Sequence, residues 1–145
     1  MYRIPRYSIT LTKDGSFKSE IKKITKAEDA YEIMKPMMEN LPVEHFQIIM
    51  LDAKCQVIGT SLVTIGTINE NIVTPIEIFQ RAILANSKAI ILVHNHPSGD
   101  PKPSREDIAL TKQIVEGGKI LQIAVLDHII IGDDKFISLK VDGYI

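Results

Sequence analysis

The amino-acid sequence predicts a mixed α/β (α+β) fold in which helices sandwich a β-sheet. One observation is the short, fully apolar run AIILV, which has the composition of a buried strand. A second is a set of longer β-rich runs bounded by turn residues. The third is the helical spacing of apolar residues behind capping signals in separate segments. Strands and helices therefore mix along the chain, which indicates a sheet with helices packed against it.

The first predicted element is an N-terminal hairpin. The run RYSITLTKD, residues 6–14, alternates apolar and polar side chains. It can pair with SFKSEIKKI, residues 16–24, across a turn at Asp14 and Gly15.

A helix is expected next, over residues 26–40. Thr25 and Glu28 have the spacing of a capping box, and apolar residues then recur at helical intervals. Pro36 is expected to bend this helix.

Two strands and a turn follow. HFQIIMLD, residues 45–52, and CQVIGTSLVTIG, residues 55–66, are β-rich and joined by a short connection, so they predict an antiparallel pair. The polar residues 69–71 then turn the chain.

The second helix and a buried strand come after this turn. Thr74, Pro75 and Glu77 combine an N-cap, a proline at the first helical position and a capping glutamate, and the apolar spacing continues to about Ser87. The run AIILV then predicts a short strand that ends at His94.

The last part of the chain predicts a third helix and two strands. Ser104 begins this helix with Asp107 at position N3, and the glycine pair 117–118 is expected to close it. LQIAVLDHIII, residues 121–131, and KFISL, residues 135–139, are predicted to be strands.

Composition limits the classes of function. We expect a single domain over residues 1–145. The 17 lysines and arginines nearly balance the 18 aspartates and glutamates, so tight binding of nucleic acid is not expected. Cys55 is the only cysteine, which excludes an internal disulfide and a cysteine-rich zinc cluster. No apolar stretch is long enough for a signal peptide or a membrane span, which predicts a cytoplasmic protein without membrane contact. The sequence does not indicate the oligomeric state.

The loop HNHPSGDPKPSRED is the candidate for chemistry. In an extended segment residues i and i+2 point to the same face, so His94 and His96 can aim two imidazoles at one point. Asp107, in the first turn of the next helix, can return a carboxylate to the same place. Two imidazoles and one carboxylate leave a fourth zinc position for water, which is typical of a catalytic zinc site.

A second interpretation of this loop needs no metal. Ser104 and Asp107 form a complete capping box by themselves, and isolated histidines are often simply hydrogen-bonded. The letters HNH also match the name of a nuclease family, but its three residues are dispersed over a ββα unit that usually lies on a basic surface, which this chain lacks.

A general base for such a site has three candidates. Glu77 is accounted for as a helix cap, and Glu106 is adjacent to Asp107 on a helix and so points elsewhere. Glu44, which precedes a central strand, has no such structural role, although the alternative is a solvated loop carboxylate.

The constellation of Glu44 before a strand and His94-x-His96-x7-Ser104-x2-Asp107 resembles the JAMM signature of JAB/MPN metallopeptidases. The segments HNHPSGDPKPS, TPIEIFQRAILANSKAIILVHNHPSG and VLDHIIIG resemble the RadC branch of that family. RadC proteins typically carry a helix-hairpin-helix module, which the first 40 residues do not resemble. We therefore expect a catalytic-type domain without it.

The resemblance implies one zinc ion held by His94, His96 and Asp107, with Glu44 as general acid/base and Ser104 stabilising the carbonyl oxygen. It implies a JAB/MPN sandwich that cuts a peptide or isopeptide bond in a peptide or protein substrate. The alternative is a non-catalytic module linked to DNA repair that binds nucleic acid or protein and in which the metal is purely structural.

Two further residues stay open at this point. Asp127 and His128 are candidates for orienting a ligand imidazole, but a strand histidine whose hydrogen bonds are made to backbone is the alternative.

Overall fold

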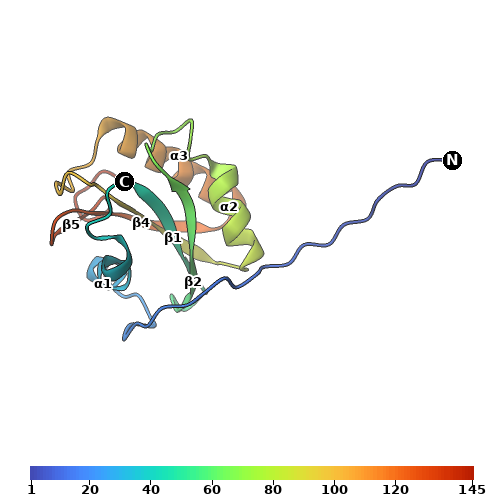
Figure 1. Cartoon of the computed structure of the whole chain (residues 1–145), viewed down its shortest axis with the longest axis horizontal. Helices are drawn as coiled ribbons and strands as arrows, with labels where there is room; N and C mark the ends of the chain where they lie inside the picture. Colours follow the sequence, from blue (N-terminus) through green and yellow to red (C-terminus); the bar gives the residue numbers. More distant parts are fainter.

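The computed structural model describes all 145 residues and contains three helices and one five-stranded sheet (Figure 1). In chain order the elements are α1 (Ala27–Met38), β1 (His45–Leu51), β2 (Val57–Ile65), α2 (Pro75–Leu84), β3 (Ala89–Asn95), α3 (Arg105–Leu121), β4 (Ala124–Ile131) and β5 (Phe136–Ser138). The predicted mixed fold is confirmed, including the antiparallel pairing of β1 with β2.

The sheet has the strand order β2-β1-β3-β4-β5. Strand β1 runs antiparallel to both β2 and β3, β3 and β4 are parallel, and β5 is antiparallel to β4. Parallel strands carry their C-terminal ends to the same edge, and the antiparallel β1 begins at that edge. Phe46 near the start of β1 and Ile130 near the end of β4 are accordingly the register partners of His94 in β3.

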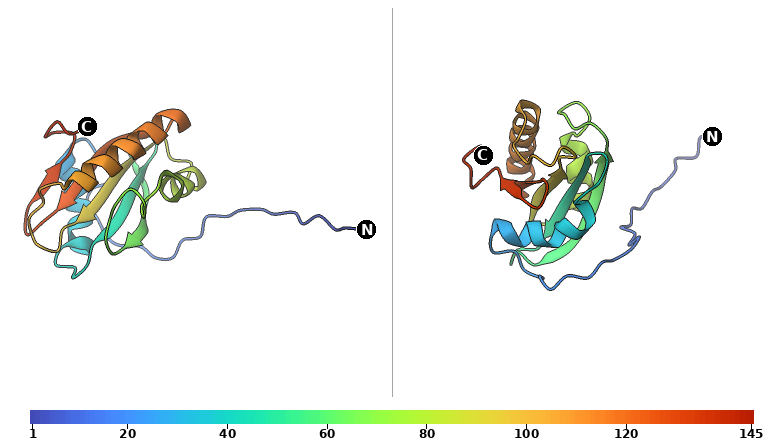
Figure 2. Two further views of the ribbon diagram at one scale, coloured as in Figure 1. Left: turned by 90° about the horizontal axis from the view of Figure 1, so that it is seen from above. Right: turned by 60° about the vertical axis from the view of Figure 1, so that its left-hand side comes forward.

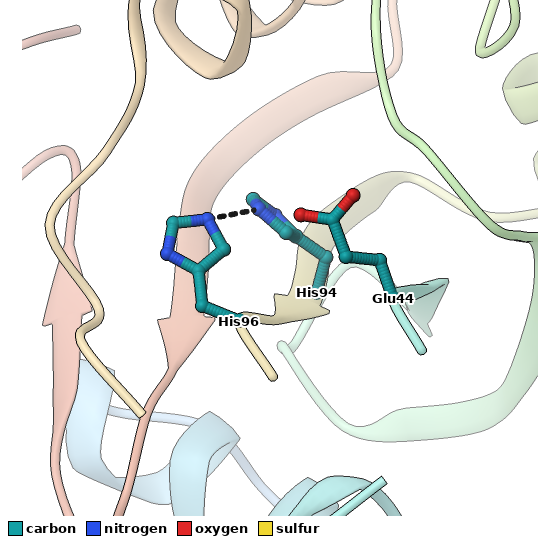
Figure 3. A group of neighbouring side chains, drawn as sticks. All are labelled: Glu44, His94 and His96. Atoms are coloured by element: carbon teal, nitrogen blue, oxygen red, sulfur yellow. Dashed lines mark hydrogen bonds between the residues drawn. The ribbon is translucent and has the colours of Figure 1, made fainter. Parts of the chain in front are cut away.

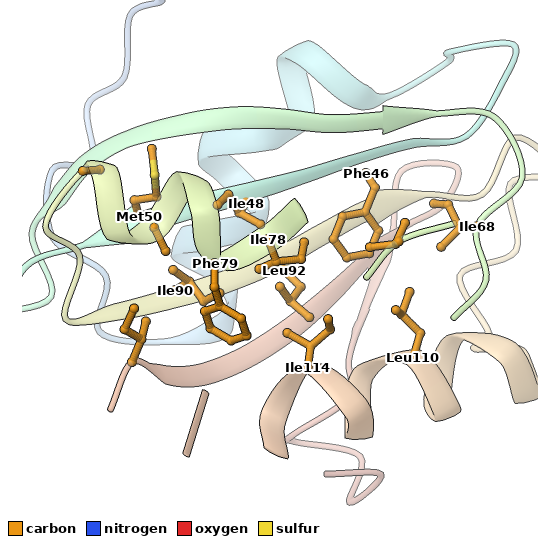
Figure 4. Close-up of a cluster of buried hydrophobic side chains, with 14 residues drawn as sticks. Phe46, Ile48, Met50, Ile68, Ile78, Phe79, Ile90, Leu92, Leu110 and Ile114 are labelled. Atoms are coloured by element: carbon orange, nitrogen blue, oxygen red, sulfur yellow. The ribbon is translucent and has the colours of Figure 1, made fainter. Parts of the chain in front are cut away.

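Helices cover both faces of the sheet, α1 on one side and α2 with α3 on the other (Figure 2). Successive strand residues point to opposite faces, so Ile90 and Leu92 of β3 join a cluster with α2 and α3 (Figure 4). Ile91 and Val93 join a second cluster with α1. None of the three helices combines the length and the apolar character that a bilayer crossing requires.

The predicted N-terminal hairpin does not form. Residues 1–20 contain no strand and are exposed throughout, and the N-terminal end of this segment extends away from the sheet (Figure 1). The second half of the expected hairpin makes only a bridge between Lys23 and Gln56, just before β2, and its end packs Ile21 and Ile24 on the cluster under α1. An isolated two-stranded hairpin is only marginally stable in water, and residues 1–20 stay exposed.

The start of α1 also differs from the prediction. Glu28 does not form the capping box. Asp29 does, because its Oδ2 atom accepts hydrogen bonds from the backbone N–H groups of Thr25 and Lys26. Thr25 therefore lies one residue before the N-cap rather than at it.

The helix α2 begins as expected but lacks the predicted capping bonds. Thr74 is the N-cap residue and makes no side-chain capping bond, while Glu77 faces Arg81 at 3.6 Å. The helix ends at Leu84, three residues before the expected Ser87.

The glycine pair in α3 does not end the helix, which continues to Leu121. A Cβ atom on Gly118 would lie 2.4 Å from the carbonyl oxygen of Ile123, so glycine here permits close packing of the helix against the chain that follows it. The helix ends instead at Gln122, whose backbone is left-handed at φ 59°.

Candidate metal centre

The end of β3 brings two imidazoles to one point. His94 continues the strand face that packs under α2 and α3, and His96 follows two residues later. Their Nε2 atoms lie 3.0 Å apart (Figure 3). The side chain of His94 is fully buried and that of His96 is 13% exposed. The i, i+2 spacing therefore predicted the convergence of the two rings correctly.

Asp107 brings a carboxylate to the same point from the first turn of α3. Its Oδ1 atom lies 3.3 Å from His94 Nε2, and its Oδ2 atom lies 3.0 Å from His96 Nε2. Only 3% of its side chain is exposed. A helix N-terminus suits this carboxylate because the unpaired N–H groups there favour negative charge.

Ser104 forms the predicted capping box with Asp107. The serine N–H donates to Asp107 Oδ2 at 2.8 Å, and the Asp107 N–H donates to Ser104 Oγ at 3.0 Å. In this box the hydroxyl oxygen of Ser104 acts only as an acceptor, so its own proton is not used. This exposed hydroxyl can cap the helix and still donate a hydrogen bond to another molecule.

Glu44, the residue before β1, lies at the same edge of the sheet. Its side chain is partly buried, and its carboxylate points toward His94 (Figure 3). Its Oε2 atom accepts a hydrogen bond from the backbone N–H of Ile68 at 3.2 Å. Glu44, His94 and His96 offer ligand atoms within 4.8 Å of one another, so these three residues can hold a metal ion.

Asn95 fixes the backbone around Glu44. This buried side chain accepts from the N–H of His45 at 2.7 Å and donates to the carbonyl of Val43 at 3.0 Å. The two bonds lie on either side of Glu44 in the sequence and hold it against the end of β3. The sequence did not identify this contact, because a residue between two inward-facing histidines is expected to point to the opposite face.

The tautomer of His96 leaves one of its ring nitrogens free to bind a cation. Its Nδ1 atom lies 2.8 Å from the carbonyl oxygen of Asp100, which can only accept, so Nδ1 carries the proton of the neutral ring. Its Nε2 atom is then a bare lone pair, 3.0 Å from both His94 Nε2 and Asp107 Oδ2. Ligands of a tetrahedral zinc ion, with bonds of about 2.0 Å, lie about 3.3 Å apart. The donor set therefore fits zinc.

Burial and charge shift the ionisation of the cluster. Burial alone raises the pKa of Asp107, but the neighbouring His94 and His96 outweigh it and hold that pKa far below the ordinary 3.8. Burial lowers the pKa of His96, but the hydrogen bond to Asp107 outweighs it and raises that pKa above 6.5. Asp107 is therefore an anion at neutral pH, as a metal ligand must be.

His128 and Asp127, whose roles the sequence left open, make different contacts. His128 is fully buried, and its Nε2 atom lies 2.7 Å from His94 Nδ1. Burial lowers its pKa well below 6.5. Asp127 accepts instead from the Ser138 hydroxyl and from the backbone N–H groups of His128 and Lys140, so its partners are not the imidazole rings of the cluster. Only the pairing of β3 with β4 distinguishes the two, and the local sequence does not reveal that pairing.

Comparison with known proteins places this chain in a family. A family model described as a RadC-like JAB domain matches residues 24–144. The UPF0758 protein of Methanococcoides burtonii is 52% identical over 124 residues, which are 86% of this chain and 54% of that protein. The UPF0758 protein of Methanosarcina mazei is 48% identical over the same shares. That of Desulforamulus reducens is 51% identical over 118 residues, 81% of this chain and 52% of that protein. The chain spans about half the length of the curated relatives it matches, and it belongs to the RadC-like JAB domain family.

Proposed function

We propose that the protein is a zinc-dependent metallopeptidase of the JAMM type that hydrolyses a peptide or isopeptide bond in a peptide or protein substrate. The observation that carries the proposal is the convergence of His94, His96 and Asp107, with separations of 3.0 to 3.3 Å between ligand atoms. Three protein ligands leave one position of a tetrahedral zinc ion open, which is the arrangement of a catalytic zinc site rather than a structural one.

Two carboxylates compete for the third ligand position. The oxygens of Asp107 lie 3.3 and 3.0 Å from the two Nε2 atoms, and the ligand atoms of Glu44, His94 and His96 lie within 4.8 Å of one another. Asp107 is rigidly held, since it is buried and belongs to the capping box with Ser104. We therefore assign His94, His96 and Asp107 as the ligands and Glu44 as the general acid/base.

When bound, zinc supplies a Lewis acid that acidifies water and polarises a carbonyl group. Glu44 then accepts the proton that the attacking water loses and returns it to the amine that leaves. Asn95 and the N–H of Ile68 hold the backbone and the carboxylate of Glu44 for this transfer. Such positioning favours catalysis because a proton is transferred efficiently only within hydrogen-bond reach.

Ser104 is assigned to the carbonyl oxygen of the substrate. Its hydroxyl oxygen accepts from the Asp107 N–H, which leaves the hydroxyl proton to donate to an oxygen that gains negative charge. The capping role and the catalytic role therefore coexist in one side chain.

A cytoplasmic location is part of the proposal. The one cysteine, Cys55, forms no disulfide, and this is typical of reducing compartments.

The test is a peptide-library cleavage assay on the full chain, with chelator, without chelator, and with zinc restored. We expect cleavage that the chelator abolishes and zinc restores. Glu44→Gln should lower turnover about a hundredfold or more, the usual contribution of a general acid/base. Glu77→Gln is the matched control, since this glutamate lies on α2 and faces Arg81, and it should keep the wild-type rate.

Two outcomes would overturn the proposal. Cleavage that survives the chelator would remove zinc from the reaction, and a fully active Glu44→Gln variant would remove Glu44. A protein that holds zinc and cleaves no member of the library would favour a binding module with a structural metal.

A further inference from the structure

A row of fully buried polar groups lies behind His94, on the side away from His96 and Asp107. His94 Nδ1 is 2.7 Å from His128 Nε2, and His128 Nδ1 is 2.6 Å from Thr111 Oγ1. Thr111 Oγ1 is in turn 2.6 Å from the backbone carbonyl oxygen of Asp107. His94, His128 and Thr111 each have 0% of their surface exposed, so bulk solvent does not reach this row.

The direction of every proton in this row follows from its last member. A carbonyl oxygen only accepts, so the single hydroxyl proton of Thr111 lies on its bond to Asp107. Toward His128 the hydroxyl oxygen therefore accepts, and the proton of that contact belongs to His128 Nδ1. Two polar atoms 2.6 Å apart without a proton between them would repel each other, so no other assignment satisfies both contacts.

The same reasoning continues to the candidate metal ligand. A neutral histidine carries one ring proton, so His128 Nε2 is a bare acceptor. The proton of its contact with His94 therefore belongs to His94 Nδ1. The remaining nitrogen of His94, Nε2, is then a lone pair aimed at His96 and Asp107.

We infer that Thr111 and His128 are positioning residues that fix the tautomer of His94, so that its Nε2 atom is free to bind the metal. The inference rests on the proposed metal site and adds two residues to it. The helix α3 then acts twice. Asp107 provides a ligand from its first turn, and Thr111, one turn later, sets the proton that prepares the opposite ligand.

The first test reads the tautomer directly in the metal-free protein. Long-range nitrogen–proton NMR spectra of the nitrogen-15-labelled full chain, recorded at about pH 8, distinguish Nδ1–H from Nε2–H rings. We expect His94 and His128 in the Nδ1–H form. In Thr111→Val, which has nearly the same shape, His128 has no acceptor, the two proton directions become similar in energy, and the Nε2–H form of His94 should appear.

The second test measures zinc affinity by competition with a chromophoric chelator. Thr111→Val should weaken zinc binding about 10- to 100-fold, which is the usual effect of removing a group that orients a ligand. Thr111→Ser keeps the hydroxyl and should retain both the tautomer and the affinity. Denaturant unfolding of the zinc-free variants serves as the control for folding.

Three results would overturn the inference: a wild-type His94 protonated on Nε2, a valine variant with unchanged tautomer and affinity, or a serine variant as weak as the valine variant. The last of these would show that the hydroxyl alone does not restore the site, so the hydroxyl would not be the group that sets the tautomer. A wild-type protein that binds no zinc would end the metal proposal, whereas the tautomer would still be decided by the metal-free spectra.

Discussion

The two faces of the sheet are built on different principles. The face under α1 packs a cluster of 13 buried hydrophobic residues, among them Met34 and Met38. The face under α2 and α3 has a similar cluster of 14, but at the edge where β3 and β4 end it continues into buried polar groups. These are His94, Asp107, Thr111 and His128.

The difference shows where stability and chemistry reside. Burial of apolar side chains on the α1 face stabilises the fold, and this effect does not depend on the orientation of the groups in contact. Buried polar groups are costly unless each finds a partner, and on the other face nearly every one does. The Nε2 atoms of His94 and His96 differ from the rest, because they face each other and a carboxylate and can hold a metal ion. The part of the core that can hold a metal is thus distinct from the cluster under α1.

The largest effect is expected from removing a ligand. His96→Ala should abolish stoichiometric zinc binding, because the two protein ligands that remain hold a tetrahedral zinc ion too weakly to compete with water. His45→Ala is the matched control, a histidine outside the cluster, and should keep one zinc per chain. Metal analysis of both purified variants checks this. Full zinc occupancy in His96→Ala would mean that other residues hold the ion.

A substitution on the α1 face should have the opposite profile. Met34 is fully buried, so Met34→Ala should lower the free energy of unfolding by about 2–5 kcal/mol. Zinc affinity of the folded protein should not change, since Met34 belongs to the cluster under α1, on the opposite face of the sheet from His94. Denaturant unfolding and chelator competition on the same sample separate these effects. A large loss of affinity would show that the faces are coupled.

Acidification should weaken zinc binding through His96. A protonated imidazole cannot bind the metal, so affinity is complete above the pKa of this ring and is lost as the pH falls through it. Because its pKa is raised above 6.5, the loss should begin above pH 6.5. Asp107, with its pKa far below 3.8, adds no competition in this range. Titration by chelator competition measures the profile, and constant affinity down to about pH 5 would point to other ligands.

The smallest effect is expected at the N-terminus. Residues 1–20 are exposed and contain no strand, so deleting them should change the free energy of unfolding by less than about 0.5 kcal/mol. Zinc affinity should be unaffected. A clear loss of stability in denaturant unfolding would show that this segment packs on the sheet.

Local patterns in the sequence predicted the parts that local physics determines. The spacing of His94 and His96 is a property of one strand, and the Ser104–Asp107 box is a property of one helix start, so both were correctly predicted. The N-terminal hairpin shows the limit of the same method. An alternating pattern does not show whether another layer of the fold will cover the segment, and residues 1–20 stay exposed.

The contacts that the sequence left open or did not predict depend on tertiary structure. His128 reaches His94 because β4 lies beside β3 in parallel register, and Thr111 reaches His128 because α3 crosses that face. Asn95 holds Glu44 across 51 positions of sequence, a contact that follows only from the pairing of β1 with β3. No periodicity within a single element contains this information.

The measurement that tests the central assignment most directly is the zinc content of three purified proteins: wild type, Asp107→Asn and Glu44→Gln. If Asp107 is the ligand and Glu44 the proton carrier, wild type and Glu44→Gln should each hold one zinc per chain, and Asp107→Asn should hold much less. Both substitutions nearly preserve side-chain size, so the comparison isolates the loss of negative charge at each position. Full zinc in Asp107→Asn together with an empty Glu44→Gln would contradict the assignment and make Glu44 the third ligand.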